Sequence, residues 1–307
     1  MKRIIITGVT GFVGRYFALE MLKAGYEVYG VARDPERVAQ ELVTNPAYRT
    51  IQGALETISV QDFGDRPFDA FFHFAWGGVN RDEIDSDTVH KVNYENSVKC
   101  LDYALAMGCS CFLDAGSRME YGSVNGVMCE DLEPHPEKAY GVWKEKFYQY
   151  AYALIKDRKD FDYIHIRIFS VIGVGDHPWS ITETACRNFL KNEPMSFGPC
   201  TQLWNFMAIE DAVKAIRLLY ENKDHFEDGD NRIVNIANYD TRVLRGFIEE
   251  IYQITESRSK LVFAEGNPGT STYADVRKLT TITGWKSEIP YYKEIEKIIG
   301  FYREKQL

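Results

Sequence analysis

The sequence has no excess of basic residues. Its 45 Asp and Glu residues outnumber its 36 Lys and Arg residues, which gives the 307-residue chain a formal net charge of −9. Proteins that follow a nucleic acid or coat an anionic membrane need a basic face. The charge balance therefore argues against a nucleic-acid or membrane partner, although local donors can still hold a small anionic ligand.

The sequence also lacks the long apolar runs and the cysteine patterns that define other protein classes. No apolar run approaches the roughly 18 residues of a membrane-spanning helix. Glycines and Arg15 interrupt the apolar N-terminal segment, so it does not fit a signal peptide. None of the six cysteines forms a CxxC pair, and no histidine lies beside them at metal-ligand spacing. We therefore expect a cytoplasmic protein with reduced, buried cysteines and no metal site.

No repeat, low-complexity tract or flexible linker divides the chain, and its hydrophobic pattern alternates between strand and helix. Residues 3–8 and 26–33 are short apolar runs typical of buried strands, whereas 12–25 and 85–107 carry helical spacing. Such alternation predicts an α/β fold with a Rossmann-type, doubly wound parallel sheet. We expect the sheet domain over 1–170, which also receives about 204–238, and a smaller C-terminal α/β lobe over most of 171–307.

A glycine-rich turn joins the first predicted strand to the first predicted helix. Gly8, Gly11 and Gly14 form the pattern G-x-x-G-x-x-G. Glycines permit a tight turn and let the backbone approach a pyrophosphate, while the helix N-terminus supplies free N–H groups. Because a strand precedes this motif and a helix follows it, the motif predicts a dinucleotide-binding turn.

The end of the second predicted strand indicates which dinucleotide binds. An acidic residue about 20 residues past the glycines would hold the ribose hydroxyls of NAD, whereas arginine favours the 2′-phosphate of NADP. Ala32 leaves room there and Arg33 follows, with Arg37 one turn beyond. Asp34 keeps NAD(H) as the alternative, because a shift of one or two residues would make it the ribose ligand. We expect NADP(H).

Tyr140 and Lys144 lie four residues apart in the predicted helix over 139–156, so they share one helix face. A phenol has a pKa of about 10 and is a poor base at neutral pH, but a neighbouring ammonium group lowers that pKa. Tyr140 could then exchange a proton with a carbinol or carbonyl oxygen while a hydride moves. The spacing by itself is common on helix surfaces, so its meaning depends on the glycine turn.

Together, these motifs resemble the extended short-chain dehydrogenase/reductase family, in its NAD(P)-dependent epimerase/dehydratase group. "TGVTGFVG" over 7–14 is similar to TGxxGxxG, "FDAFFHFAW" over 68–76 to DxxxHxAA, and "YGVWK" over 140–144 to YxxxK. "IRIFSVIGVG" over 166–175 resembles LRxxNxYGPG, "WNFMAIEDAVKAI" over 204–216 resembles RDFxxVxDxAxAI, and "TGW" over 283–285 resembles LGW. The sheet domain is then the NAD(P)-binding domain, and the C-terminal lobe binds the substrate.

The resemblance implies roles for individual residues. Ser117 lies five residues before Gly122, at the position of the catalytic Ser or Thr, and would hydrogen-bond the reacting oxygen. Tyr140 would transfer the proton, and Lys144 would tune Tyr140 and hold the nicotinamide ribose. The cofactor-binding residues would be Gly8, Thr10, Gly11, Phe12, Val13, Gly14, Arg33, Ala75, Asn93, Tyr140 and Lys144. The substrate-binding residues would be Trp76, Arg118, Ser170, Trp179 and Trp204. Homodimerisation through a helix pair is the habit of the family.

Departures from the family pattern narrow the reaction. Family members that dehydrate a sugar carry Asp-Glu directly after the catalytic Thr, because elimination needs a base and an acid. Arg118 and Met119 occupy those positions, and Glu120 comes one place late, where it would point to the other face of an extended strand. These residues argue against dehydration and weaken the sugar-decarboxylase alternative.

The substrate positions depart as well. Trp76 replaces an alanine, Ser170 an asparagine and Trp204 an arginine of the family pattern, and the chain resembles the branch of CDP-abequose-type nucleotide-sugar 4-ketoreductases. We therefore expect NADPH-dependent reduction of a nucleotide-linked 4-keto-6-deoxy sugar. Two alternatives stay open, a nucleotide-sugar 4-epimerase using bound NAD and a catalytically silent NADP-binding regulatory protein. Silent members commonly lose the serine, tyrosine or lysine, and this chain has all three.

Three side chains near the expected substrate site have more than one interpretation. Arg118 meets a phosphate or a sugar hydroxyl, or it forms a structural ion pair. Trp179 forms a wall of the substrate site or packs between the lobes. His177 is expected to be a solvated loop residue.

Overall fold

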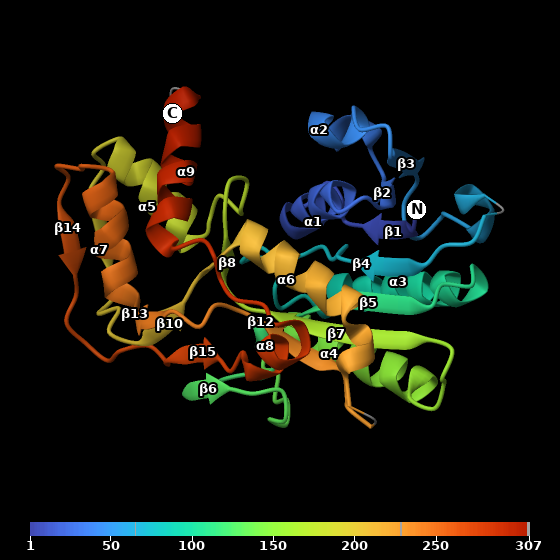
Figure 1. Cartoon of the computed structure of the whole chain (residues 1–307). Helices are drawn as coiled ribbons and strands as arrows, with labels where there is room; N and C mark the ends of the chain where they lie inside the picture. Colours follow the sequence, from blue (N-terminus) through green and yellow to red (C-terminus); the bar gives the residue numbers. More distant parts are fainter. Residues whose placement is uncertain (65, 228, 306–307) are drawn as a thin grey trace.

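The computed structural model describes residues 1–64, 66–227 and 229–305, and its centre is a parallel sheet. Within these residues, seven strands lie in the order β12-β7-β5-β4-β1-β2-β3, and each neighbouring pair is parallel (Figure 1). The strands are β1 (Arg3–Thr7), β2 (Glu27–Ala32), β3 (Tyr48–Gln52), β4 (Ala70–His73), β5 (Cys111–Ser117), β7 (Asp162–Ile168) and β12 (Ile233–Ile236). This is the strand order of a dinucleotide-binding fold, in which the order reverses between β1 and β4.

Strand β1 illustrates why these runs form the inside of the sheet. Ile4, Ile5 and Ile6 are each 0% exposed. Because side chains alternate along a strand, Ile4 and Ile6 join the core on one face of the sheet while Ile5 joins the core on the other. Burial of each such side chain stabilises the fold by about 1.5–3 kcal/mol.

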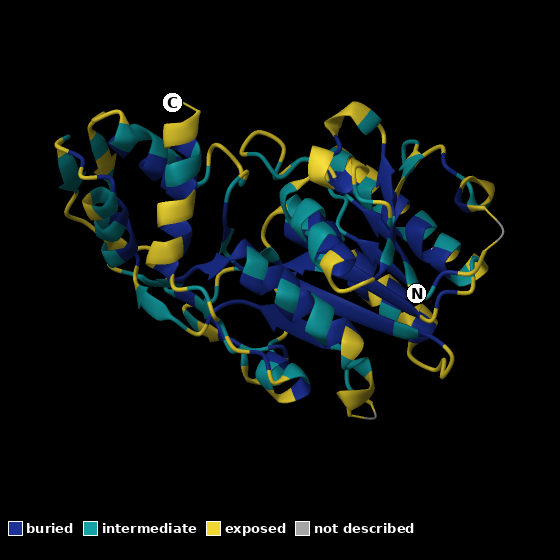
Figure 2. Ribbon diagram, turned by 45° about the horizontal axis from the view of Figure 1, so that its top comes forward, coloured by how far each residue is buried: buried dark blue, intermediate teal, exposed yellow. Residues whose placement is uncertain are grey.

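Helices cover both faces of the sheet. One face packs against α1 (Phe12–Lys23), α2 (Gln40–Val43), α6 (Ile209–Glu221) and α8 (Arg277–Thr283), and the other against α3 (Asp87–Ala106) and α4 (Ala139–Ile155). Figure 2 shows the buried strands between helices whose outer surfaces are exposed. The predicted doubly wound α/β fold is confirmed.

A second core lies in the C-terminal lobe. It is built by α5 (Ile181–Leu190), α7 (Leu244–Ile254) and α9 (Tyr291–Glu304), which stand apart from the central sheet in Figure 1. Short strand pairs accompany this lobe and its junction with the sheet domain. They are β6 (Gly126–Met128) with β15 (Thr272–Ala274), β8 (Val171–Ile172) with β11 (Met207–Ala208), β9 (Met195–Phe197) with β14 (Leu261–Phe263), and β10 (Leu203–Asn205) with β13 (Thr241–Val243).

The core residues show how the chain returns to the sheet domain after residue 170. Helix α6 and strand β12 contribute to the core around β1, as do Leu279 and Ile282 of α8. The sheet domain therefore draws on segments from late in the sequence. Within the described residues, no helix combines the length and apolar character needed to cross a membrane.

Candidate active site

The glycine turn between β1 and α1 is packed so closely that side chains would not fit. Gly8 has φ of +78°, and a Cβ at this position would lie 2.8 Å from the backbone nitrogen of Ala75. A Cβ on Gly14 would overlap the carbonyl oxygen of Gly8. Helix α1 begins after Gly11, where no side chain caps the first N–H groups. This combination of free N–H groups and an open backbone surface suits the pyrophosphate of a dinucleotide.

Two adjoining cavities open beside this turn. The first, of about 270 Å³, extends toward the end of β2 and is lined by residues that include Gly8, Thr10, Gly11, Ala32, Arg33, Ala75, Trp76 and Asn93. The second, also about 270 Å³, extends toward the end of β5 and is lined by residues that include Phe12, Val13, Gly14, Ser117, Tyr140, Lys144 and His177. Gly8, Gly11, Phe74 and Trp76 line both cavities, so they form one continuous site at the sheet edge where strand order reverses.

The residues at the end of β2 differ in what they face. Arg33 is exposed and lines the first cavity. The carboxylate of Asp34 instead accepts a hydrogen bond of 3.1 Å from the backbone N–H of Glu36, which caps a short 3-10 helix over Pro35–Arg37. The Asp34 carboxylate therefore binds the backbone of its own turn. Of the two charged residues that directly follow β2, Arg33 lines the cavity and Asp34 does not.

Asn93 lies on α3 beside the first cavity, but its amide is engaged with the backbone. Its Oδ1 accepts a hydrogen bond of 3.0 Å from the N–H of Gly77, and its Nδ2 donates one of 3.0 Å to the carbonyl of the same residue. The Asn93 side chain thus holds the loop after β4 in place. It has this structural role whether or not it also contacts a cofactor.

Ser117, Tyr140 and Lys144 meet in the second cavity although they come from two elements. Ser117 ends β5 and starts η3 (Arg118–Glu120), while Tyr140 and Lys144 lie one turn apart on α4. The Lys144 ammonium donates a hydrogen bond to the carbonyl of Ala115, and it lies 5.2 Å from the centre of the Tyr140 ring. The structure therefore brings these three predicted residues together.

Burial controls the protonation of the two residues on α4. Burial lowers the pKa of Lys144 to about 8, although the carboxylates of Asp114 and Glu120 act to raise it. Burial raises the pKa of Tyr140 above its ordinary value, and a hydrogen bond with the Ser117 hydroxyl acts in the opposite direction. We expected Lys144 to lower the pKa of Tyr140, but burial is the largest influence on that pKa and raises it. The phenol is therefore protonated at neutral pH.

Trp76 and His90 form an aromatic wall beside Tyr140. The Trp76 ring lies edge-on to the Tyr140 ring at 6.2 Å, and the Lys144 ammonium lies 4.0 Å from the centre of the Trp76 ring. His90 is 0% exposed, and its ring is 5.5 Å from that of Tyr140. Sequence reasoning missed His90, because nothing in the pattern of α3 distinguishes it from an ordinary helix residue.

Three other predicted substrate residues, Arg118, Ser170 and Trp204, contact one another. Ser170 and Trp204 line a third cavity of about 390 Å³, where the indole N–H of Trp204 donates a hydrogen bond of 2.9 Å to the Ser170 hydroxyl. The Arg118 guanidinium lies 4.9 Å from the centre of the Trp204 ring. Burial alone lowers the pKa of Arg118, and no carboxylate in the described ranges forms an ion pair with it. The structural ion pair that we considered for Arg118 is therefore absent from the described chain.

The loop between β8 and α5 carries two aromatic residues, Trp179 and His177. Trp179 is 54% exposed and stacks on His177 at 4.7 Å between ring centres. Trp179 is not part of the lining of the three cavities described above, so neither role that we considered for it is seen. His177 is an exposed loop residue, as expected, and it also lines the second cavity.

Glu120 lies beneath the site rather than in it. Residues 118–120 form the short helix η3 instead of an extended strand, and the Glu120 side chain is 0% exposed. As expected, the Glu120 side chain points away from the cavity. It does so because the chain turns into η3 at this point, and not because side chains alternate along an extended strand. No carboxylic acid follows Ser117 into the cavity at positions 118 and 119.

The chain is similar to known proteins over most of its length. The model of the NAD dependent epimerase/dehydratase family matches residues 4–237. CDP-abequose synthase of Salmonella muenchen is 23% identical over 313 residues, which cover 97% of this chain and 97% of that protein. UDP-N-acetyl-alpha-D-glucosaminuronate decarboxylase of Bacillus cytotoxicus is 24% identical over 332 residues, which cover 99% of this chain and 98% of that protein.

Two solved structures share the fold. MoeE5 in complex with UDP-glucuronic acid and NAD superposes with a TM-score of 0.83 at 24% identity, covering 99% of this chain and 100% of that chain. UDP-glucuronic acid 4-epimerase from Bacillus cereus in complex with NAD superposes with a TM-score of 0.84 at 20% identity, with the same coverage. At these identities the similarity shows the extended short-chain dehydrogenase/reductase fold.

Proposed function

The chain belongs to the NAD dependent epimerase/dehydratase family, whose members are NAD(P)-dependent enzymes that act on nucleotide sugars. From that premise we propose that this enzyme uses NADPH to reduce a nucleotide-linked 4-keto-6-deoxy sugar. The resemblance to CDP-abequose synthase over nearly the whole chain supports this assignment. The absence of carboxylic acids at Arg118 and Met119 argues against dehydration, which needs an acid and a base at the sugar.

The two residues that follow β2 are the reason why we propose NADPH rather than NADH as the cofactor. Arg33 lines the cavity beside the glycine turn, while the carboxylate of Asp34 is held by the Glu36 N–H. A guanidinium at this position suits a 2′-phosphate, and a carboxylate engaged elsewhere is a poor ligand for ribose hydroxyls. The glycine turn, whose backbone a Cβ would obstruct, would hold the pyrophosphate. When bound, NADPH supplies the hydride that reduces the carbonyl carbon.

The protein residues would manage the proton. Tyr140 is a protonated phenol in the cavity and would donate its proton to the carbonyl oxygen of the substrate. Ser117 would hydrogen-bond the same oxygen and orient it. Lys144, whose pKa burial lowers to about 8, is mostly a charged ammonium at neutral pH. It would stabilise the phenolate that forms when Tyr140 gives up its proton.

Arg118 would bind an anionic or hydroxyl oxygen of the substrate. Its guanidinium rests on the Trp204 ring at 4.9 Å, and the Trp204 indole is itself fixed by Ser170. A flat cation held on an aromatic face keeps its N–H groups directed outward, where an oxygen can accept from them. We propose Trp76, Ser170 and Trp204 as further walls of the sugar site.

The experiment that tests the function measures NADPH oxidation with CDP-, dTDP-, GDP- and UDP-linked 4-keto-6-deoxyhexoses. We expect turnover with at least one of these compounds and reduction at carbon 4. Tight NADPH binding without turnover on any compound would contradict reduction and favour a silent, NADP-binding regulatory protein.

A nucleotide-sugar 4-epimerase is the second candidate. It is supported by the fold similarity to the UDP-glucuronic acid 4-epimerase that was solved with NAD. The cofactor in the purified protein discriminates between the two. Firmly retained NAD, together with interconversion of sugar epimers and no net NADPH consumption, would overturn the reductase proposal.

A further inference from the structure

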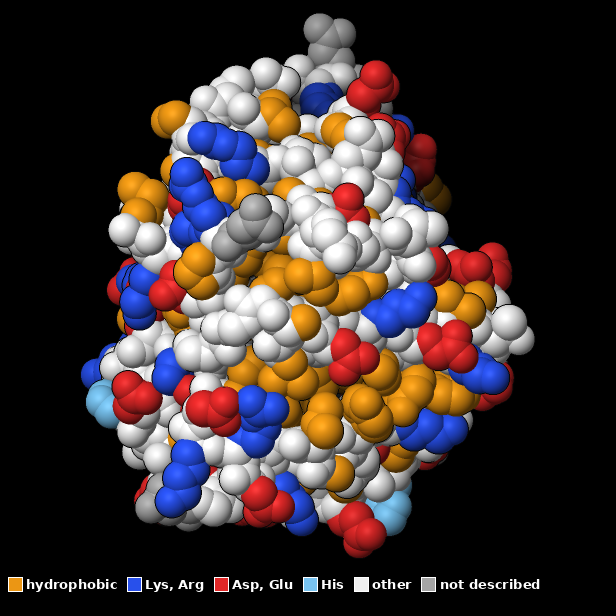
Figure 3. Space-filling model, turned by 90° about the vertical axis from the view of Figure 1, so that its right-hand side faces the viewer, with side chains coloured by type: hydrophobic (Ala, Val, Ile, Leu, Met, Phe, Trp, Pro, Cys, Tyr) orange, Lys and Arg blue, Asp and Glu red, His pale blue; other side chains and the backbone are white. Residues whose placement is uncertain are grey.

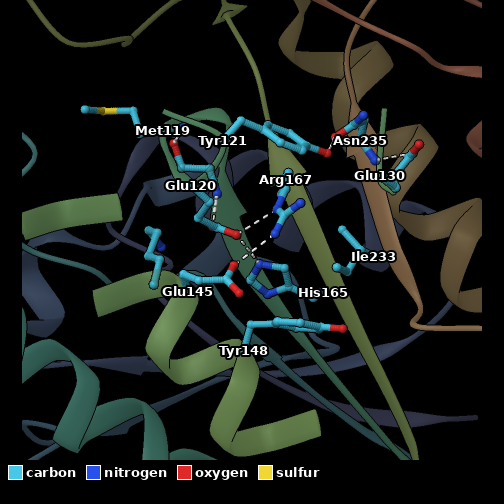
Figure 4. Close-up of polar contacts among 12 residues, drawn as sticks. Met119, Glu120, Tyr121, Glu130, Glu145, Tyr148, His165, Arg167, Ile233 and Asn235 are labelled. Carbon is cyan, nitrogen blue, oxygen red and sulfur yellow. Dashed lines mark hydrogen bonds and ion pairs between the residues drawn. The ribbon is translucent and has the colours of Figure 1, made fainter. Parts of the chain in front are cut away.

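Five charged side chains form a buried ion network beneath the candidate active site, and all five are at most 9% exposed. They are Asp114, Glu120, Glu145, His165 and Arg167. Imidazole nitrogens of His165 lie 3.0 Å from Asp114 and 2.8 Å from Glu120. Arg167 contacts Glu120 at 2.8 Å and Glu145 at 2.9 Å (Figure 4).

This network ends on the backbone of Ser117. Oε1 of Glu120 accepts a hydrogen bond of 2.6 Å from the Ser117 N–H, and the Ser117 hydroxyl accepts one of 3.2 Å from the N–H of Met119. Gly116 leaves the necessary room, because a Cβ there would overlap His165 and would lie 2.6 Å from Oε1 of Glu120. The conformation of the serine at the strand end is thus tied to one buried carboxylate.

The same network ends on helix α4. Arg167 joins Glu120 of η3 to Glu145, and Glu145 directly follows Lys144 in the sequence. The two elements also approach closely, since a Cβ on Gly141 would lie 2.5 Å from the carbonyl oxygen of Met119. Arg167 therefore bridges the element that carries Ser117 and the helix that carries Tyr140 and Lys144.

The charges of the network are mutually dependent. Burial alone would lower the pKa of His165, but the carboxylates of Asp114 and Glu120 raise it to about 9. Burial alone would raise the pKa of Glu120, but His165 and Arg167 hold it at about 2. His165 and Glu120 are therefore both charged at neutral pH, and loss of one would leave the other charge buried without that partner.

We propose that Glu120 is a positioning residue, which together with Arg167 fixes Ser117 relative to Tyr140 and Lys144. This proposal rests on the proposed roles of those three residues in proton transfer. The carboxylate has a second effect, because it acts on the Lys144 ammonium through space. The other titratable groups that face Lys144 are Asp114 of β5, His73 of β4, His90 of α3 and Tyr140 of α4 itself.

The chain offers a matched control for Glu120. Glu130 is also a buried carboxylate, 7% exposed, and its Oε1 accepts a hydrogen bond of 2.9 Å from the N–H of Asn235. In Figure 4 the dashed line at Glu130 runs to Asn235, and within the described part of the chain Glu130 forms no hydrogen bond or ion pair with Ser117 or the five network residues. Glu120→Gln and Glu130→Gln therefore make the same chemical change, and only the first acts on the active site.

The experiment compares the two variants with NADPH and with the 4-keto-6-deoxyhexose nucleotide that the wild-type protein reduces. For Glu120→Gln we expect kcat to fall by about tenfold to a hundredfold, as for other small misplacements of reacting groups, while NADPH affinity changes little. The alkaline limb of the kcat profile should move to lower pH, because Lys144 loses a neighbouring negative charge. Glu130→Gln should leave kcat and its pH profile unchanged. Equal kcat and equal pH profiles for the two variants would overturn the proposal.

Hydrogen exchange gives a readout that does not need the substrate. The segment 115–122 should exchange faster in Glu120→Gln than in wild type or Glu130→Gln. A glutamine has only one acceptor oxygen, so its NH2 group must face either the Ser117 N–H or the donors of His165 and Arg167, and one of these hydrogen bonds is lost. Where Glu120→Gln does not fold, Glu145→Gln breaks only the α4 side of the bridge and should show a smaller loss of kcat. Unchanged kcat in that variant would contradict the proposal.

Failure of the proposed function is a separate result. Should the wild-type protein reduce none of the 4-keto compounds, the reductase assignment falls and the exchange rate of 115–122 alone decides the role of Glu120. Exchange at the wild-type rate in Glu120→Gln would then overturn the proposal.

Discussion

The indole N–H of Trp76 points to Nδ1 of His90 at 3.1 Å, and the opposite nitrogen of that imidazole lies 3.2 Å from the carbonyl of Ile84. Because Trp76 can only donate, His90 must accept at Nδ1 and donate from Nε2, which makes it a neutral histidine. Burial also lowers the pKa of His90, in agreement with the neutral form. A buried, uncharged histidine thus holds the indole against the Lys144 ammonium.

This arrangement makes the charge of Lys144 sensitive to Trp76. The pKa of Lys144 is about 8, so kcat of the wild-type protein should fall as pH rises through about 8. Trp76→Leu removes a cation–π contact of the kind that contributes about 0.5–2 kcal/mol. Its loss should disfavour the ammonium and move the alkaline limb to lower pH by about 0.4–1.5 units, because one pKa unit corresponds to about 1.4 kcal/mol. Trp76→Phe keeps an aromatic face and should move the limb less, and equal shifts in both variants would contradict this account.

Tyr140→Phe tests the proposed proton transfer. Removal of the hydroxyl should lower kcat by about 10²- to 10⁴-fold, as for other general acids, because the group that we propose as the proton donor is gone. The ring that packs against Trp76 and His90 stays, so NADPH affinity and thermal stability should change little. The check is single-turnover kinetics beside NADPH titration. Retained turnover would show that Tyr140 is not the proton donor.

The central sheet and the three proposed catalytic residues could be predicted because their signals are local. The apolar run of β1, the glycine spacing and the four-residue step from Tyr140 to Lys144 each fit the period of one element. Strand β3 could not be predicted in this way. It is an edge strand with Tyr48 buried but Arg49 and Gln52 exposed, so it carries neither a continuous apolar run nor a regular alternation.

Other features depend on contacts between residues far apart in the sequence. Glu120 pairs with His165 across 45 residues and with Arg167 across 47, and no local spacing marks such a pair. The wall residue His90 was missed for the same reason. Its position follows from how α3 packs, which only the folded chain specifies.

Arg33→Ala tests the cofactor preference. Loss of a charge-assisted hydrogen bond of about 1.5–3 kcal/mol to the 2′-phosphate should weaken NADPH binding by about tenfold or more, with little change for NADH. Arg37 is an exposed arginine on the same segment that does not line the cavity, so Arg37→Ala is the control. The measurement is the ratio of dissociation constants for NADPH and NADH. A ratio unchanged by Arg33→Ala would favour NAD and weaken the reductase proposal.

Gly8→Ala tests the close approach of the glycine turn. Gly8 and Gly25 both have positive φ, +78° and +88°, but only a Cβ at Gly8 meets neighbouring backbone atoms. Gly25→Ala should cost the backbone strain of about 1–2 kcal/mol alone. Gly8→Ala should lower the melting temperature further and abolish dinucleotide binding, because the turn must move away from Ala75. Equal melting temperatures with binding retained in both would show that the turn has room for a side chain.

We propose that the chain forms a homodimer through α3 and α4. Figure 3 shows that hydrophobic side chains gather in patches between charged ones on one side of the molecule, so the surface does carry exposed apolar areas. Val92 of α3 is 42% exposed, and Tyr150 and Leu154 of α4 are 37% and 45% exposed. Apolar surface on two adjacent helices suits a partner with the same surface, because an isologous contact buries both copies.

Leu154→Glu tests this dimer, because it would place a charge within the proposed contact. Sedimentation velocity should show a dimer for the wild type and a monomer for the variant at micromolar concentration. Val43 of α2 is 44% exposed on another element, so Val43→Glu should remain dimeric. A monomeric wild-type protein would contradict the proposal. Dissociation of the dimer by both substitutions would also contradict it, because dissociation would then not depend on a charge in α4.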